Sequence, residues 1–383
     1  MEGRIMNNPT LPPELIREIL LRLPVRSVLR CKCVCKSWLS LISDPQFSIS
    51  HYDLAANPSH RILLRANYLY AESIDVDAPF HSDSSAVYLL LPPLSPPHNP
   101  CHYDAFQFDP DIWGSCRGFI LLYYRRCRCA EIILWNPSIG VHKRLPNVKH
   151  YYITNGYLRG LGYDPSTNDY LVVCIRLLRD ETTILICSTK TYSWNIAYGD
   201  VLYRVRDNKF RAGSLVNGAL HWLVFSRYKK VPVILAFDLI QRRLSEIPLI
   251  DHLTSKKYEV YCLRAMGEFL SVSCSVEGCA EDEIWVMKEY KVQSSWTKYM
   301  VIPTYETQCN RFSPICFTKD GRILGSNIGG RLEKLNDKGK VLEIFTYGGY
   351  EKLYCVNLQS AMYRESLLSI PNVIRETCED DQP

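Results

Sequence analysis

The chain has 383 residues, of which 47% are hydrophobic and 22% charged, enough apolar material for a sizeable core. This length predicts two domains or one large β domain. The net charge of +5 is too small to indicate nucleic-acid binding, and no apolar run approaches the roughly 18 residues needed to span a membrane.

The N-terminus and the cysteines predict where the protein works. The opening residues, MEGRIMNNPT, lack the basic patch and apolar block of a signal peptide. The 16 cysteines are scattered along the chain without the spacing of a small disulfide framework. Together these features predict reduced thiols in a protein of the cytoplasm or the nucleus.

The first predicted elements are short helices near the N-terminus. An apolar stripe at helical spacing lies between Pro12 and Pro24, and these two prolines mark where its helix starts and ends. A second apolar set follows, from Val25 to Ile42. About three short helices in some 35 residues cannot bury all of their own apolar surface. Part of that surface is therefore expected to pack on the following domain or on a partner protein.

Three cysteines at alternate positions, Cys31, Cys33 and Cys35, raise the question of a metal site. A structural zinc site needs four ligands, usually arranged as two close pairs. The nearest histidine is His51, and no second pair lies at a usual spacing. We therefore predict no metal and no cofactor, and interpret these cysteines as small apolar residues.

The stretch LPPELIREILLRLPVRSVLRCKCVCKSWLSLISDPQF, residues 11–47, resembles an F-box. The matching features are the Leu-Pro-x-Glu opening, the Ile-Leu-x-x-Leu-Pro middle and the Val-Cys-Lys-x-Trp close. The resemblance implies that residues 8–50 form a helical module that docks on a Skp-type adaptor. Through that adaptor the module would join the cullin and RING subunits of a ubiquitin ligase.

The adaptor contact is predicted from side-chain type, because apolar and aromatic anchors carry most of the energy of such interfaces. Burial inside the module is the expectation for Ile19, Val34 and Ile42 instead. The residues predicted to contact the adaptor are Leu11, Pro12, Ile16, Leu20, Leu23, Pro24 and Trp38.

The rest of the chain repeats with a period near 50 residues. Hairpin-like turns at Gly118, Asn168, Gly218, Gly267 and Gly321 are separated by 50, 50, 49 and 54 residues. A second strand pair follows each turn. Its equivalent positions (Trp135, Ser188, Phe237, Met287 and Leu335) are separated by 53, 49, 50 and 48 residues. Four short strands per repeat of this length are typical of a kelch-like β-propeller blade.

Strands near the two ends of the chain complete the predicted ring. Five blades fit between residues 112 and 350, and strand-like sequence remains on both flanks. Combining the flanking strands into one further blade would close the ring and remove its unpaired edges. We therefore expect a mainly β protein, a helical module followed by a propeller of six blades, with seven as the alternative.

The expected domain organisation follows from these elements. The F-box module takes residues 8–50, and a linker with the first propeller strands and a Pro-rich loop takes 51–111. The propeller proper takes 112–372, and an acidic tail takes 373–383.

An ordered series of short segments resembles the F-box-associated domain of plant F-box proteins. The segments are LWNPS, GLGYDPSTNDYLVV, NGALHWL and AFDL, without the double glycine of a true kelch repeat. The repeating tryptophans could suggest sugar stacking, but their regular placement favours core positions between blades. These tryptophans are Trp135, Trp194, Trp222, Trp285 and Trp296.

Loops between the repeats are the expected recognition elements, because a rigid scaffold displays function on its loops. Several of them mix basic and aromatic residues, and Lys256 and Lys257 add to the same charge. We expect an acidic or phosphorylated stretch of a target protein to bind there, with an ordinary solvated surface as the alternative. The predicted contact residues are Arg204, Arg206, Lys209, Arg211, Arg227, Tyr228, Lys229 and Lys230.

The sequence contains no G-x-S-x-G, P-loop, H-E-x-x-H or G-x-G-x-x-G motif. We therefore predict a non-catalytic substrate receptor with a protein target and no nucleic-acid or membrane partner. Two alternatives stay open. One is a propeller enzyme or lectin with a fused helical module, and the other is an F-box scaffold that acts outside a ligase.

Overall fold

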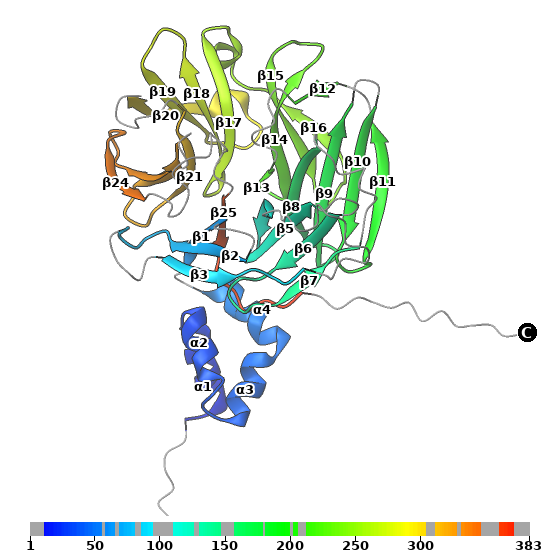
Figure 1. Ribbon diagram of the computed structural model, residues 1–383, viewed down its shortest axis with the longest axis vertical. Coiled ribbons are helices and arrows are strands. Elements are labelled where there is room, and N and C mark those ends of the chain that lie inside the picture. Colours follow the sequence, from blue (N-terminus) through cyan, green and yellow to red (C-terminus); the bar gives the residue numbers. More distant parts are fainter. Residues whose placement is uncertain are drawn as a thin grey trace, which may run out of the picture.

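The protein consists of four helices followed by six small β-sheets arranged in a ring (Figure 1). This computed structural model describes residues 11–55, 58–65, 69–80, 86–94, 110–125, 130–146, 157–178, 181–199, 202–205, 212–303, 311–327, 331–345 and 360–370. The acidic tail and most of the Pro-rich loop lie outside these residues. No described helix is both long and apolar enough to cross a membrane.

The helices lie together below the ring (Figure 1). Proline and capping residues mark several of their ends. Pro12 precedes the first helix and Pro24 follows it, as predicted. Asp44 caps the last helix, since its Oδ1 accepts a hydrogen bond from the Gln46 amide at 3.1 Å. The helices are α1 (Pro13–Arg22), α2 (Val25–Cys31), α3 (Lys36–Ser43) and α4 (Pro45–Leu54).

The fourth helix differs from the prediction of about three helices. The sequence PQFSISHYDL of α4 mixes polar and apolar residues without a clear stripe, so periodicity did not reveal it. Only the Asp44-Pro45 start signal was available. The helix also runs four residues past the expected module boundary at residue 50.

Each sheet is one propeller blade of antiparallel strands, so the prediction of six blades is confirmed. Blade 1 contains β1 (His60–Arg65), β2 (Tyr70–Asp75), β3 (Ala86–Leu90) and β25 (Ser360–Arg364). Blade 2 contains β4 (Asp111–Cys116), β5 (Phe119–Arg125), β6 (Ala130–Trp135) and β7 (His142–Arg144). Blade 3 contains β8 (Tyr157–Asp164), β9 (Asp169–Leu177), β10 (Thr182–Ser188) and β11 (Ser193–Gly199).

Blades 4 to 6 repeat the pattern around the ring. Blade 4 contains β12 (Tyr203–Arg204), β13 (Ser214–Val216), β14 (Ala219–Ser226), β15 (Pro232–Asp238) and β16 (Leu244–Ile247). Blade 5 contains β17 (Tyr258–Met266), β18 (Phe269–Val276), β19 (Glu281–Met287) and β20 (Trp296–Pro303). Blade 6 contains β21 (Ser313–Phe317), β22 (Ile323–Ser326), β23 (Leu332–Leu335) and β24 (Val341–Phe345). Short 3-10 helices, η3 (Asp251–Thr254) and η4 (Gln293–Ser295), interrupt two connections.

The ring closes by pairing the two ends of the propeller. Strand β25 is antiparallel to β1, with His60 opposite Arg364 and Ile62 opposite Met362. Figure 1 shows β25 on the inner side of its blade, next to the centre of the ring. This is the sixth blade that the sequence predicted from its flanking strands.

The predicted hairpin turns occur at the positions that the repeat indicated. Asn168 has a φ of 52°, Gly218 of 70°, Gly267 of 62° and Gly321 of 82°. These left-handed conformations suit glycine and asparagine, which explains why the repeat shows them there.

Antiparallel strands give each blade two different ends. The turns from the first to the second strand and from the third to the fourth strand share one end, which we call the turn end. In blade 4 this end holds residues 217–218 and 239–243. The connection from the second to the third strand and the entry from the preceding blade share the opposite end, the loop end. In blade 4 this end holds residues 202–205 and 227–231.

The core lies in the seams between neighbouring blades. One buried apolar cluster fills each of the six seams, and a seventh lies within the helices. Trp135, Trp222, Trp285 and Trp296 are buried in the seams and Trp194 is half-buried against one, so the expected core role is confirmed. Gly160 and Gly162 allow blade 4 to approach β8 closely, since a Cβ at Gly162 would lie 2.4 Å from Leu239 Cδ1.

Candidate functional site

The helical module exposes one apolar row along its first helix. Leu11, Leu15 and Ile19 are four residues apart and are 55%, 50% and 49% exposed. Val34, between α2 and α3, is 62% exposed, and Leu39 on α3 is also exposed. We call these five residues the outer apolar surface.

The opposite side of α1 faces inward. Leu20 is 1% exposed and packs in the cluster that includes Val28, Ile42 and Phe47. This position corrects the prediction that Leu20 contacts the adaptor. The expectation that Ile19 and Val34 are core residues is also wrong, whereas Ile42 is buried as expected. A helical stripe with two apolar rows does not reveal which row faces the module's own core.

The remaining residues predicted to contact the adaptor lie at or near the surface. Pro12 and Pro24 are exposed. Ile16, Leu23 and Trp38 are half-buried against the module's cluster, so each presents part of its surface outward. Their contact with an adaptor stays a prediction.

Two of the three cysteines of the module, Cys33 and Cys35, flank Val34 of the outer apolar surface in the sequence. Cys31 is half-buried, whereas Cys33 and Cys35 are exposed. The Cys35 Sγ lies 3.0 Å from Ser37 Oγ, and this hydrogen bond lowers the pKa of the Cys35 thiol. Among the described residues, no group of three or more His, Cys, Asp or Glu side chains is placed to hold a metal ion.

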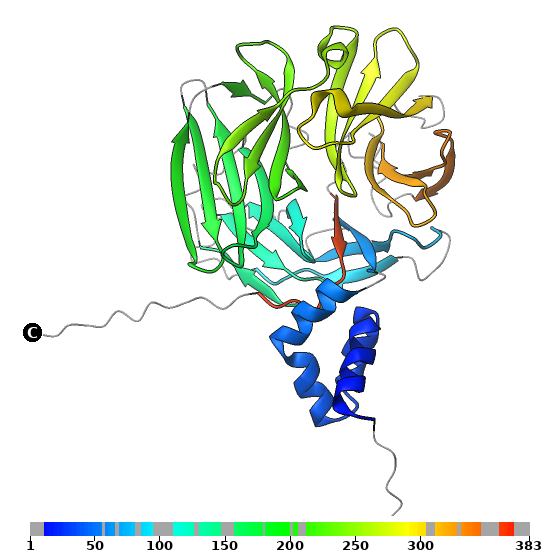
Figure 2. The same ribbon diagram turned by 180° about the vertical axis from the view of Figure 1, so that it is seen from behind.

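Helix α4 lies between the other helices and the ring (Figure 2), and it contacts the turn ends of blades 1 and 2 through Arg364 and Arg117. The Tyr52 ring lies between two guanidinium groups, with its centroid 4.8 Å from Arg117 Cζ and 4.0 Å from Arg364 Cζ. Arg364 also donates a hydrogen bond to the Tyr52 carbonyl oxygen. Arg26 of α2 pairs with Glu365 at 3.2 Å, just after the ring-closing strand. Burial between the module and the ring raises the pKa of Tyr52.

His51 connects two helices of the module. Its ring is buried, and Nε2 donates a hydrogen bond to the Leu23 carbonyl oxygen at 2.8 Å. Burial lowers the pKa of His51, which keeps the imidazole neutral. The end of α1 is therefore tied directly to the helix that rests on the ring.

The predicted recognition residues that the structure describes gather at the loop end of blade 4. Arg204 lies on β12, and Arg227 to Lys230 form the loop between β14 and β15. Two strand pairings, Tyr203 with Ser226 and Arg204 with Phe225, bring the two segments together. Arg206, Lys209 and Arg211 lie outside the described residues.

Two of these cations already serve the fold. The Arg227 guanidinium donates hydrogen bonds to the carbonyl oxygens of Tyr203 and Leu178, both at 3.0 Å. Lys229 Nζ pairs with Glu246 at 2.5 Å. Burial, together with the Glu246 carboxylate, raises the pKa of Tyr203 to about 12. Arg227 and Lys229 therefore brace the loop end.

The other three residues face outward. Tyr228 is 90% exposed and Lys230 is exposed beside it, with a left-handed φ of 56°. The exposed Arg204 side chain extends across the Phe225 ring, with Cζ 4.5 Å from its centroid. An aromatic side chain and two cations are therefore exposed on the two segments that meet at the loop end of blade 4.

A small cavity opens beside this surface, between blades 4 and 5. Its volume is about 50 Å³, and Val205, Phe225, Pro232 and Tyr261 contribute to its lining. Phe225, whose ring lies under the Arg204 guanidinium, is one of the lining residues, so this cation lies next to the cavity. The sequence did not predict this cavity because its walls come from two blades. The one available signal was that aromatic and apolar residues alternate with the basic ones in these loops.

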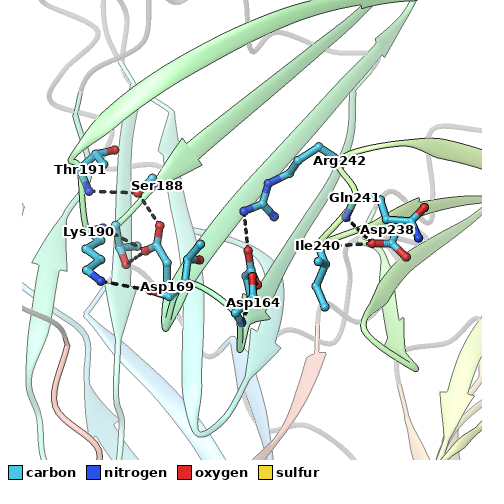
Figure 3. A network of polar contacts seen from close by, with 12 residues as sticks. Asp164, Asp169, Ser188, Lys190, Thr191, Asp238, Ile240, Gln241 and Arg242 are labelled. Atoms are coloured by element: carbon cyan, nitrogen blue, oxygen red, sulfur yellow. Dashed lines mark hydrogen bonds and ion pairs between the residues drawn. The ribbon is translucent and has the colours of Figure 1, made fainter.

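A polar network occupies the turn end of blades 3 and 4 (Figure 3). Arg242 Nη2 donates a hydrogen bond to Asp164 Oδ2 at 2.7 Å and joins the two blades. Asp169 accepts hydrogen bonds from Ser188 Oγ, from Thr189 Oγ1 at 2.9 Å and from the Lys190 amide at 3.0 Å. Figure 3 shows a similar turn in blade 4, where Asp238 Oδ1 accepts hydrogen bonds from the Ile240 and Gln241 amides at 2.9 and 2.7 Å.

An open groove of about 640 Å³ lies over this network. Its lining includes Thr167, Lys190, Asn195 and Arg242. Lys190 Nζ donates a hydrogen bond to the Thr167 carbonyl oxygen at 3.1 Å, and Arg242 is paired with Asp164. The charged groups of the groove are thus used in joining strands and blades.

A small helical module seated on a six-bladed propeller, with apolar residues exposed on the module, defines a two-part protein with a helical and a propeller domain. An F-box domain model matches residues 9–50, and a model of the F-box associated beta propeller domain matches residues 62–339. The chain belongs to this family of F-box proteins with an associated propeller.

Curated relatives in Arabidopsis thaliana span most of the chain. An F-box/kelch-repeat protein is 28% identical over 317 residues, which cover 76% of this chain and 79% of the relative. The F-box protein CPR1 is 26% identical over 349 residues, with 81% and 78% covered. An F-box/LRR-repeat protein is 24% identical over 394 residues, with 95% and 84% covered.

Proposed function

We propose that this protein is the substrate-receptor subunit of a Skp–cullin–F-box ubiquitin ligase. The helical module binds a Skp-type adaptor, which brings the cullin and RING subunits, and the propeller holds a target protein. The chain makes no covalent bond itself. It raises the effective concentration of the target near the ubiquitin-carrying enzyme, and the target then goes to proteasomal degradation.

The outer apolar surface carries this proposal. Leu11, Leu15 and Ile19 form a regular row of large side chains, each about half exposed. Exposed apolar groups that gather on one face mark an interaction site. Membership of the F-box family makes a Skp-type adaptor the partner that such a face would bind.

The test is co-purification of the full chain with a Skp-type adaptor. We expect Leu15→Asp combined with Ile19→Asp to lower adaptor affinity at least ~30-fold, since two charges would enter an apolar interface. Leu54→Asp on α4 is the matched control, because Leu54 is 62% exposed and lies outside the outer apolar surface. Unchanged adaptor binding by the double variant, with Leu54→Asp also unchanged, would overturn the proposal.

A scaffold outside a ligase is the remaining alternative for an adaptor-binding protein. The two are separated by depleting the cullin while the level of a captured target is followed. The receptor role requires the target to accumulate. Adaptor binding without cullin-dependent loss of the target would favour the scaffold.

We also propose that the protein works in the cytoplasm or the nucleus. The ten cysteines for which the structure gives a state are all free, and Cys116, Cys174 and Cys316 are buried thiols whose pKa burial raises to about 12. Such thiols suit a reducing compartment. A fluorescent fusion seen only in secretory organelles would contradict this placement.

A further inference from the structure

We infer that the loop end of blade 4 binds a linear acidic segment of the target, with one small apolar side chain of that segment entering the cavity between blades 4 and 5. The inference rests on the proposed receptor function and names the class of ligand that the propeller takes. We call Arg204, Tyr228, Lys230 and the mouth of the cavity the recognition surface.

The recognition surface is held by backbone and side-chain contacts before any ligand binds. The Arg227 amide donates a hydrogen bond to the Leu202 carbonyl oxygen at 2.9 Å, in addition to the two bonds made by its guanidinium. The loop from Ser226 to Val231 is closed by its own hydrogen bond, from the Ser226 amide to the Val231 carbonyl oxygen at 2.9 Å. A preformed surface loses little conformational entropy on binding.

The charge of this surface selects an acidic ligand. Residues 202–205 and 226–231 carry four cationic side chains and no acidic one. Glu259, which lines the cavity, is paired with Arg311 at 2.8 Å. Arg227 and Lys229 are engaged with carbonyl oxygens and Glu246, which leaves Arg204 and Lys230 directed outward. Arginine next to an aromatic ring binds carboxylates well because its planar guanidinium is already oriented.

The apolar part of the surface supplies an anchor. Tyr228 projects into solvent almost completely, an unusual position for a tyrosine that has no partner to cover it. Val205, Phe225 and Pro232 are among the walls of the cavity beside Arg204, and His221 and Glu259 also line it. Its volume of about 50 Å³ admits a small apolar side chain, and Glu259 disfavours an acidic one. The ligand is therefore expected to combine acidic residues with a small apolar one.

The turn end is less suited to capture. The module occupies it on blade 2, through Arg117 and Tyr52. On blades 3 and 4 the cations Lys190 and Arg242 are held by Thr167 and Asp164. The loop end of blade 4 lies opposite and leaves its outward cations accessible.

The test uses the full chain in complex with a Skp-type adaptor, and a library of random twelve-residue peptides displayed on phage. We expect the selected peptides to be net negative and to share one small apolar residue. Binding of a selected peptide, measured by fluorescence anisotropy, should fall at least ~10-fold with Arg204→Glu plus Lys230→Glu, and at least ~5-fold with Tyr228→Ala.

Two variants control for charge and for loss of an aromatic ring. Arg243→Glu reverses a charge at the turn end of the same blade, and Tyr88→Ala removes an exposed ring from blade 1. Both should keep peptide affinity within ~2-fold. Selection of no peptide, of peptides without acidic residues, or of peptides whose binding survives both recognition variants would overturn the inference.

Adaptor binding is measured on the same samples and separates the two proposals. If the recognition variants keep the adaptor while the wild type fails to bind acidic peptides, the inference fails and the receptor function stands. If the wild type fails to bind the adaptor, the receptor function fails whatever the peptides do.

Discussion

Buried carboxylates stabilise turns of this propeller by accepting several hydrogen bonds each. Asp169 is almost completely buried, yet three donors from the β10–β11 turn surround it. A charged acceptor with several donors stabilises a fold more than a neutral pair does, because each bond is charge-assisted. The turn-end network of Figure 3 depends on this residue.

We predict that Asp169→Asn destabilises the propeller by about 2 kcal/mol, since the amide cannot accept at both former oxygen positions. The free energy of unfolding is measured by urea denaturation, with tryptophan fluorescence as the signal. Asp337→Asn, at an exposed turn position of blade 6, should change the free energy of unfolding by less than ~0.5 kcal/mol. Equal shifts in the two variants would contradict the assigned role.

Glu333 on β23 makes stability depend on pH. It is buried, and one of its oxygens accepts a hydrogen bond from Asn327 Nδ2 at 2.6 Å. Burial raises the pKa of this carboxyl to about 7. Between the ordinary pKa near ~4.3 and this value, the folded protein keeps a proton that the unfolded chain has lost. Its stabilising contribution is therefore fully present below pH ~4.3 and is lost as the pH rises towards 7.

We predict that Glu333→Gln removes this loss of folding stability at rising pH. Relative to the wild type, the variant should gain up to ~3 kcal/mol between pH 5 and pH 8, which is the limit set by the size of the pKa shift. Thermal unfolding midpoints at several pH values give the difference curve. A difference that stays flat across this range would show that Glu333 titrates normally.

At the scale of elements, the ring depends on one short strand. β25 is five residues long and supplies the innermost strand of blade 1. It also contributes Ala361 and Tyr363 to the seam with blade 2. Without it, β1 would become an unpaired edge beside an apolar seam, which favours aggregation.

We predict that ending the chain at residue 359 abolishes the monomeric folded propeller. A chain that ends at Ile370 retains every strand that the structure describes and serves as the control. Size-exclusion chromatography with light scattering should show large aggregates for the shorter chain and a monomer for the longer one. A monomeric shorter chain with unchanged unfolding temperature would refute a closing role for β25.

The elements also show what a sequence can and cannot predict. The period near 50 residues and the Asn and Gly turns led to six blades, because turn chemistry is local and repeats. Helix α4 was missed because tertiary contacts, and not amphipathicity, support it. The recognition residues Arg227 and Lys229 were predicted from charge, but only coordinates reveal that carbonyl oxygens and Glu246 engage them.

The choice between the two sides of α1 had the same physical limit. Leu15 and Leu20 are both leucines on one helix, and their roles depend on what lies next to each. The positions of α2, α3 and α4 determine which side of α1 is buried. The spacing of apolar residues in α1 does not predict those positions.

At the scale of the whole molecule, module and ring form one connected body. The Tyr52 stack, the Arg26–Glu365 ion pair and Leu367 in the module's cluster cross between them. These contacts set the direction in which the module's outer apolar surface points relative to blade 4.

We predict that Tyr52→Ala weakens this connection by about 2 kcal/mol, because it removes an aromatic ring held between two cations. Differential scanning calorimetry should then resolve a separate, earlier transition for the helices. Leu54→Ala, an exposed position two residues further along α4, is the control and should leave one transition. A single unchanged transition in Tyr52→Ala would mean that the stack contributes little.

The pairing of β25 with β1 also fixes the order in which the protein matures. His60 must wait for Arg364, which the ribosome adds about 300 residues later. The helices also wait for the end of the chain, because Leu367 completes their cluster and Arg364 and Glu365 hold them to the ring. The half-built ring therefore exposes the unpaired edge of β1 until the last strand has been made.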